Sequence, residues 1–144
     1  MKGFLRHILV SISYRFQKTV IGTDASFGDF QIGKGARSPL EILHHMNQVL
    51  EFAIAKVNKA PRSMVPKMKW REEIDYFIEL LKEIDLKVEE KDIDNETAER
   101  LLQGPLSDVL THVGQIAMLR RLNGAPIKGE SFYDADIRKG VFEY

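Results

Sequence analysis

Pro105-Leu-Ser-Asp-Val-Leu-Thr-His-Val-Gly-Gln-Ile-Ala-Met-Leu119 has the spacing of an amphipathic helix. Asp108 and His112 lie four residues apart, so on a helix they share one face. That face is also the apolar one, since it carries Val109, Val113, Ile116 and Leu119. Polar groups that point into a helix bundle cost free energy unless they are paired. A divalent metal would satisfy both side chains, and so would a direct carboxylate–imidazole hydrogen bond.

The rest of the chain predicts three further long helices, over residues 3–21, 38–58 and 69–86, before the one over 105–123. The clearest start is Ser38-Pro-Leu-Glu41, where Ser38 and Glu41 can form a capping box. Residues 22–37 are expected to form a long connection. A charged stretch over 87–96 should end the third helix, Gly104-Pro105 should reset the chain after a short helical turn, and residues 125–144 should form an irregular tail. We therefore predict one all-α domain over residues 1–144, a four-helix bundle.

A second histidine is expected to face the same interior. By counting about 100° per residue, His45 borders the apolar face of the helix over 38–58, whereas His44 lies nearly opposite and should face water. His45, Asp108 and His112 are thus a candidate metal site, because two imidazoles and a carboxylate suit Zn²⁺, Ni²⁺, Fe²⁺ or Mn²⁺ and leave positions open. A structural Asp–His hydrogen bond without metal remains the alternative.

Two other residues are candidates for positions around this site. Gln115 lies one helical turn beyond His112 and could orient a ligand. Tyr133 belongs to an aromatic and polar part of the tail that could fold over the bundle and line the cleft. A loosely packed tail is the alternative for Tyr133.

The composition excludes several classes of function and several kinds of site. Lys and Arg together number 21, as do Asp and Glu, so the net charge is zero and nothing favours binding to a nucleic-acid backbone. The absence of cysteine excludes disulfides, thiolate metal sites and a cysteine nucleophile. No apolar run approaches the roughly 18 residues of a membrane-spanning helix. We expect a cytoplasmic protein without membrane partners, and the neutral charge leaves room for a homodimer.

Two segments together resemble the DinB/YfiT-like family of bacterial four-helix proteins. They are Ser38-Pro-Leu-Glu-Ile-Leu-His-His-Met46 and His112-Val-Gly-Gln-Ile-Ala-Met-Leu-Arg120. In that family a histidine of the second helix joins an H-x-x-x-H pair on a later helix, which continues with a Gly-Gln-Ile-like run. The resemblance implies a metal held by His45, Asp108 and His112. The chain departs from the pattern at Asp108, which takes the place of the first histidine of the pair.

The resemblance also implies a type of chemistry. Family members of known activity are similar to glutathione-transferase analogues, which use a low-molecular-weight thiol such as bacillithiol or mycothiol while the metal lowers the pKa of that thiol. We therefore expect a metal-dependent enzyme that acts on a small molecule as a thiol-dependent transferase or isomerase. Many relatives have no assigned activity. The alternative is a non-catalytic helical interaction module, dimeric, in which Asp108 forms a structural pair with a histidine.

Overall fold

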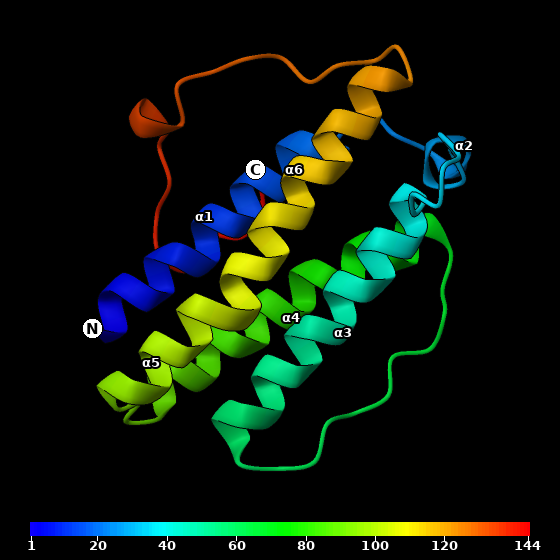
Figure 1. The fold of residues 1–144 in the computed structure, drawn as a ribbon. Coiled ribbons are helices and arrows are strands. Elements are labelled where there is room, and N and C mark those ends of the chain that lie inside the picture. Colours follow the sequence, from blue (N-terminus) through cyan, green and yellow to red (C-terminus); the bar gives the residue numbers. More distant parts are fainter.

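The computed structural model describes all residues 1–144, and its regular secondary structure consists of helices alone. Four long helices dominate (Figure 1): α1 (Lys2–Val20), α3 (Pro39–Asn58), α4 (Trp70–Glu90) and α6 (Ser107–Leu122). Shorter helical elements are α2 (Ala25–Gly28), α5 (Asn95–Leu101), the π-helical segment η1 (Leu102–Leu106) and the 3-10 turn η2 (Phe132–Asp134). The predicted all-α class is confirmed. None of these helices has the length and apolar character needed to cross a membrane.

The long helices pack as a ring around one core. α3 contacts α4, α4 contacts α1, α1 contacts α6, and α6 contacts α3 (Figure 1). Phe16 of α1 and Phe77 of α4 meet at the centre, with ring centroids 4.3 Å apart and both side chains fully buried. In this arrangement the α3–α6 side of the bundle lies opposite the α1–α4 side. The candidate site belongs to the α3–α6 side, and the C-terminal tail belongs to the α1–α4 side.

The start of α3 follows the predicted capping box. The Ser38 hydroxyl accepts the Glu41 N–H at 3.2 Å, and the Glu41 carboxylate accepts the Ser38 N–H at 2.7 Å. Pro39 occupies the first turn, where its missing N–H costs nothing. This cap fixes where α3 begins and therefore which of its side chains face α6.

Replacing Ser38 with alanine is expected to lower the free energy of unfolding by about 1 kcal/mol, the usual cost of losing an N-cap. Urea denaturation of the two proteins measures the difference. Ser26→Ala is a matched control, because Ser26 is an exposed serine of the short helix α2 and caps no long helix. Equal stabilities of wild type and Ser38→Ala would show that the cap does not stabilise the fold.

Helix α4 extends four residues further than predicted, to Glu90. The charged stretch does not end the helix, because Val88 is completely buried and continues the apolar stripe of Leu81 and Ile84. The surrounding charged side chains stay at the surface, as is usual for one face of an amphipathic helix. The charge of this stretch was therefore a poor signal for the end of the helix.

The prediction that Gly104-Pro105 resets the chain is also wrong. α5, η1 and α6 follow one another without a break from Asn95 to Leu122. In a regular α-helix the ring of Pro105 would collide with the carbonyl four residues earlier, and the wider π turn avoids that collision. Ser107 completes the segment, since both its N–H and its hydroxyl donate to the Leu102 carbonyl. The π-helical segment thus ends at Leu106, two residues before Asp108.

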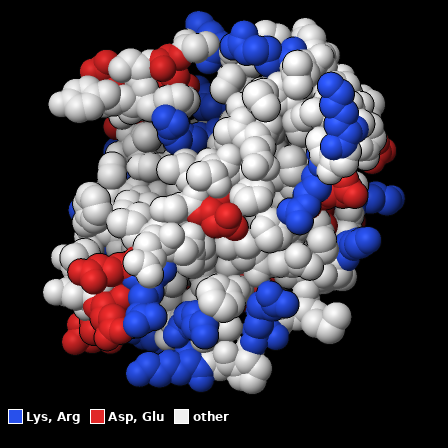
Figure 2. Space-filling view, viewed as in Figure 1, with Lys and Arg blue, Asp and Glu red and all other residues white.

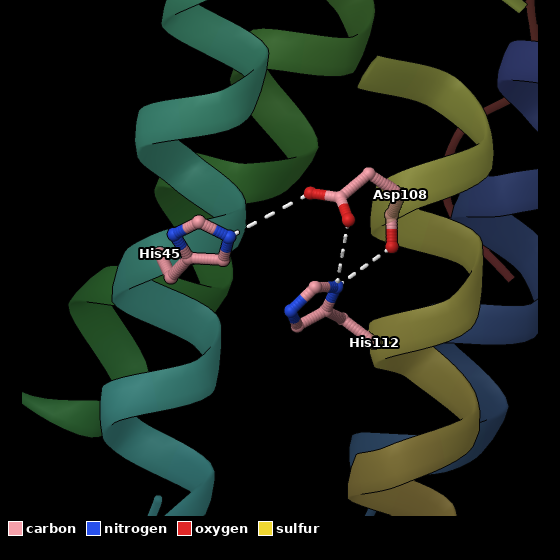
Figure 3. A group of neighbouring side chains, drawn as sticks. All are labelled: His45, Asp108 and His112. Carbon is pink, nitrogen blue, oxygen red and sulfur yellow. Dashed lines mark hydrogen bonds and ion pairs between the residues drawn. The ribbon is translucent and has the colours of Figure 1, made fainter. Parts of the chain in front are cut away.

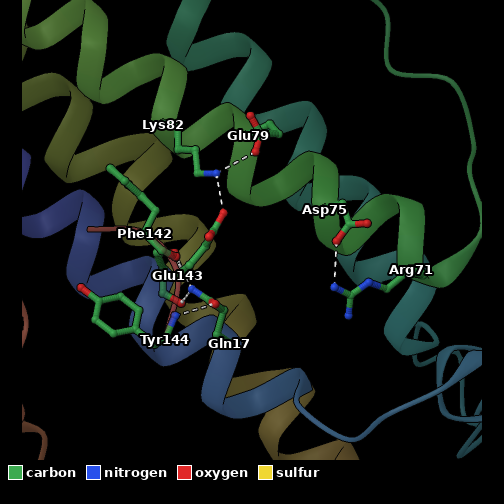
Figure 4. Close-up of polar contacts among 9 residues, drawn as sticks. Gln17, Arg71, Asp75, Glu79, Lys82, Phe142, Glu143 and Tyr144 are labelled. Carbon is green, nitrogen blue, oxygen red and sulfur yellow. Dashed lines mark hydrogen bonds and ion pairs between the residues drawn. The ribbon is translucent and has the colours of Figure 1, made fainter. Parts of the chain in front are cut away.

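The C-terminal tail folds back on α1 and α4 (Figure 4). Phe142 is buried, and its carbonyl accepts hydrogen bonds from the Ser13 hydroxyl at 2.9 Å and from the Gln17 side-chain amide. Lys82 of α4 forms an ion pair with Glu143 at 2.9 Å. The tail is thus fixed on the α1–α4 side of the bundle, away from the α3–α6 side.

Candidate metal centre

His45, Asp108 and His112 lie together between α3 and α6 (Figure 3). His45 Nε2 is 3.6 Å from Asp108 Oδ2, and His112 Nδ1 is 3.5 Å from Asp108 Oδ1. The two imidazole rings are 4.9 Å apart between centroids. One potential ligand atom from each residue can be chosen so that all three lie within 4.8 Å of one another. The structure thus brings together the three residues singled out from the sequence.

The first two turns of α6 fix the ring of His112. Its Nδ1 lies 2.7 Å from the Asp108 backbone carbonyl, one turn earlier, so this nitrogen is the N–H donor. The other ring nitrogen, Nε2, is then unprotonated in the neutral ring and points toward His45 (Figure 3). Histidines that bind metals commonly have one nitrogen held in this way, because the hydrogen bond fixes both the tautomer and the ring orientation.

The three residues have the donor types and the freedom that a metal ion requires. Ligand atoms around a tetrahedral ion at about 2.1 Å are roughly 3.4 Å apart, closer than the 4.8 Å within which the potential ligand atoms of the three residues lie here. Short side-chain movements would close the difference, since the side chains of His45 and Asp108 are 34% and 43% exposed. His112 is only 12% exposed and would supply the fixed point. Two nitrogens and one carboxylate suit Zn²⁺, Ni²⁺, Fe²⁺ or Mn²⁺.

The surroundings of His45 favour its neutral form, which is the form that binds metal. Burial lowers the pKa of His45 from its ordinary value of 6.5, and the neighbouring His112 and Arg37 lower it further. Asp108 acts in the opposite direction but does not overcome these effects. The unfolded chain, in which His45 has its ordinary pKa, therefore binds the proton more readily than the folded protein does. The neutral His45 side chain thus contributes stability that is present above about pH 6.5 and is lost as the pH falls.

In metal-free protein, an NMR titration of His45 should accordingly give a midpoint below 6.5. Asp108→Asn should lower that midpoint further, because it removes the one charge that favours the imidazolium. A midpoint above 6.5, or a rise on Asp108→Asn, would contradict this description of the site.

A groove of about 620 Å³ opens beside the three residues. Its walls come from α3, from η1 with the start of α6, and from the connector before α4, which contributes Arg62. Figure 2 shows the corresponding face of the molecule, on which one acidic group lies within a wide uncharged area and basic side chains lie below and to its right. This volume is in the range of small-molecule sites in proteins.

The expectation that His44 faces water is wrong. Its Nδ1 lies 2.8 Å from Oε1 of Glu73, a fully buried carboxylate of α4, and its side chain is only 15% exposed. Asn47 donates to the same carboxylate at 2.6 Å. Angular counting assumed a single buried face on α3, whereas α3 packs against both α4 and α6 and so has two.

The two additional candidates are not part of the group. Gln115 is exposed and does not line the groove. The Tyr133 side chain is 97% exposed, in a tail segment beside α1 rather than between α3 and α6. Thr111 and Arg62 do line the groove. Thr111 lies one turn beyond Ser107 and next to His112, which was a usable signal, but nothing in the sequence around Arg62 indicated its position.

Comparison of the chain with known protein families, with curated proteins and with solved structures gives no match.

Proposed function

We propose that this chain is a divalent-metal-dependent enzyme of the DinB/YfiT-like kind that acts on a small molecule, by thiol-dependent transfer or isomerisation. One observation carries the proposal. One histidine of α3 and an aspartate and a histidine of α6 converge at the edge of an open groove, with their potential ligand atoms within 4.8 Å of one another. The resemblance of residues 38–46 and 112–120 to that family supports the same reading.

His45, Asp108 and His112 would hold the ion and leave at least one of its positions open toward the groove. A divalent ion bound there would lower the pKa of a thiol or a water molecule that reaches it. The chain itself supplies orientation and access. The hydrogen bond to the Asp108 carbonyl holds His112 with Nε2 free, and the groove leaves the half-exposed His45 and Asp108 accessible to a small substrate.

The activity can be tested with a thiol and a fluorogenic electrophile. Metal-loaded protein is incubated with bacillithiol, mycothiol or glutathione and with monochlorobimane, and formation of the thioether is followed by fluorescence. We expect a rate that requires added metal and is lost in Asp108→Ala but kept in His7→Ala, whose histidine lies on α1 away from the site. Equal rates with and without metal, for every thiol, would refute the thiol-dependent activity.

A second candidate function follows from the contacts of Asp108. Its carboxylate lies within ion-pair distance of both histidines without any ion, at 3.6 Å and 3.5 Å. The three residues would then be a structural cluster in a non-catalytic, dimeric helical module. This alternative predicts a melting temperature that is the same in EDTA and in Zn²⁺, and a dimer by analytical ultracentrifugation.

A further inference from the structure

The groove at the candidate centre continues into a second hollow. This hollow has a volume of about 630 Å³ and lies between the last turns of α3 and the α5–η1 segment. The two spaces share the side of Phe52 and the π-helical residues Gln103, Gly104 and Pro105. A ligand longer than a single small group could therefore extend from the three-residue cluster over Phe52 into the second hollow.

The charged side chains along this path are almost all basic. Asp108 is the one acidic residue that lines either space. Of the basic residues, Arg62 lines the first groove, and Lys56 and Arg100 line the second hollow. Arg100 is paired with Glu96 at 2.8 Å. Arg62 and Lys56 form no ion pair with any carboxylate of the chain, and both are exposed. Two cations are thus available to a ligand, and an ion at the centre would add positive charge at the other end.

The part of the path between these charges is apolar. Phe52 is 41% exposed, which is unusual for an aromatic side chain and leaves its ring open to the groove. Val49, one turn earlier on α3, adds a second apolar surface. The ammonium group of Lys56 lies 5.0 Å from the centroid of the Phe52 ring, within the range of a cation–π contact. Apolar surface and positive charge therefore adjoin each other.

We infer that the groove binds a small amphipathic anion. Its carboxylate, sulfonate or phosphate group would lie beside Phe52, where the groove lined by Arg62 adjoins the hollow lined by Lys56, and its apolar or aromatic part would cover Phe52 and Val49. The end nearest α6 would then reach His45 and Asp108. The inference rests on the proposed function in one respect only, that this anion is the substrate of the enzyme. Binding of the anion can be measured whether or not the chain has that enzymatic activity.

A pair of fluorescent probes separates the charge from the apolar part. 8-Anilinonaphthalene-1-sulfonate carries a sulfonate that N-phenyl-1-naphthylamine lacks, and the aromatic parts are otherwise the same. We expect Arg62→Gln and Lys56→Gln each to weaken binding of the sulfonate probe about fivefold to tenfold, the usual effect of losing one charge-assisted contact. Neither variant should change binding of the uncharged probe by as much as twofold, because the aromatic surface remains.

Lys67→Gln is the matched control, since Lys67 is an exposed lysine of the same connector as Arg62 and does not line the groove. It should bind both probes as wild type does. Phe52→Ser should weaken the binding of both probes, because the aromatic part of each would lie on the Phe52 ring. Wild-type affinity of the sulfonate probe in both Arg62→Gln and Lys56→Gln, or of both probes in Phe52→Ser, would overturn the inference.

The same titrations in His112→Ala keep this inference separate from the proposed function. That variant removes a candidate metal ligand but none of the residues assigned to the anion, so metal-free protein should bind the sulfonate probe unchanged. If the chain proves to bind no metal while the Arg62 and Lys56 effects hold, the proposed enzyme is refuted and the anion site remains. If metal binds but the two substitutions have no effect, the anion site is refuted alone.

Discussion

Excess Zn²⁺ is expected to raise the melting temperature of the wild-type protein by roughly 10 °C, and to leave that of His112→Ala unchanged. A ligand present at a thousand times its Kd stabilises the folded state by about 4 kcal/mol. His112 is the least exposed of the three candidate ligands, and its ring is fixed by the 2.7 Å contact with the Asp108 carbonyl. Loss of this ligand leaves only His45 and Asp108, and two ligands are too few for a tight site.

Differential scanning fluorimetry with and without Zn²⁺ measures this effect. His7→Ala is the matched control, because it removes an exposed histidine of α1 that has no partner near the site. It should respond to Zn²⁺ as wild type does. A rise in melting temperature that persists in His112→Ala would mean that Zn²⁺ binds elsewhere on the protein.

Glu73→Ala should cause the largest loss of stability among the polar substitutions, about 3 kcal/mol in the free energy of unfolding. The Glu73 carboxylate is completely buried between α3 and α4. It contacts His44 Nδ1 at 2.8 Å and accepts hydrogen bonds from the Asn47 amide at 2.6 Å and the Met68 N–H at 3.1 Å. Removing it leaves three buried or half-buried polar groups without that partner, and each costs free energy.

Chemical denaturation of wild type, Glu73→Ala and Glu83→Ala tests this expectation. Glu83 is an exposed glutamate of the same helix, so its replacement should change the stability by less than about 0.5 kcal/mol. At temperatures where Glu73→Ala is folded, it should still bind Zn²⁺, because it retains all three candidate ligands. Equal stabilities of Glu73→Ala and wild type would show that the buried cluster contributes nothing to folding.

The sequence predicted most of the fold because the helical spacing of apolar residues is strong in four long segments. It failed where tertiary contacts override a local signal. The Gly104-Pro105 pair normally ends a helix, but here the π turn accommodates the proline ring, and the helix continues into Asp108. The charged stretch after Leu86 could not show that Val88 is buried against the core.

The candidate site was predictable to the extent that each residue could be placed on a face of a known helix. His45 and Asp108 were placed on facing sides in this way, and their 3.6 Å separation agrees. His44 was misplaced, because its partner Glu73 is a charged residue on another helix and no pattern within α3 reveals it. Tyr133 was misplaced for a similar reason, since its neighbours in the tail contact α1: Glu130 accepts a hydrogen bond from Tyr14, and Phe132 packs against Arg15.

Elemental analysis of untagged protein, purified without chelator, shows directly whether His45, Asp108 and His112 hold a metal ion. Wild type is compared with His45→Ala and Asp108→Ala, which remove one candidate ligand from each of the two helices. We expect about one divalent ion per wild-type chain, and we expect both variants to lose it. Wild-type protein that contains no metal, even after incubation with Zn²⁺, Ni²⁺ and Mn²⁺, would contradict the metal centre and favour a structural Asp–His cluster.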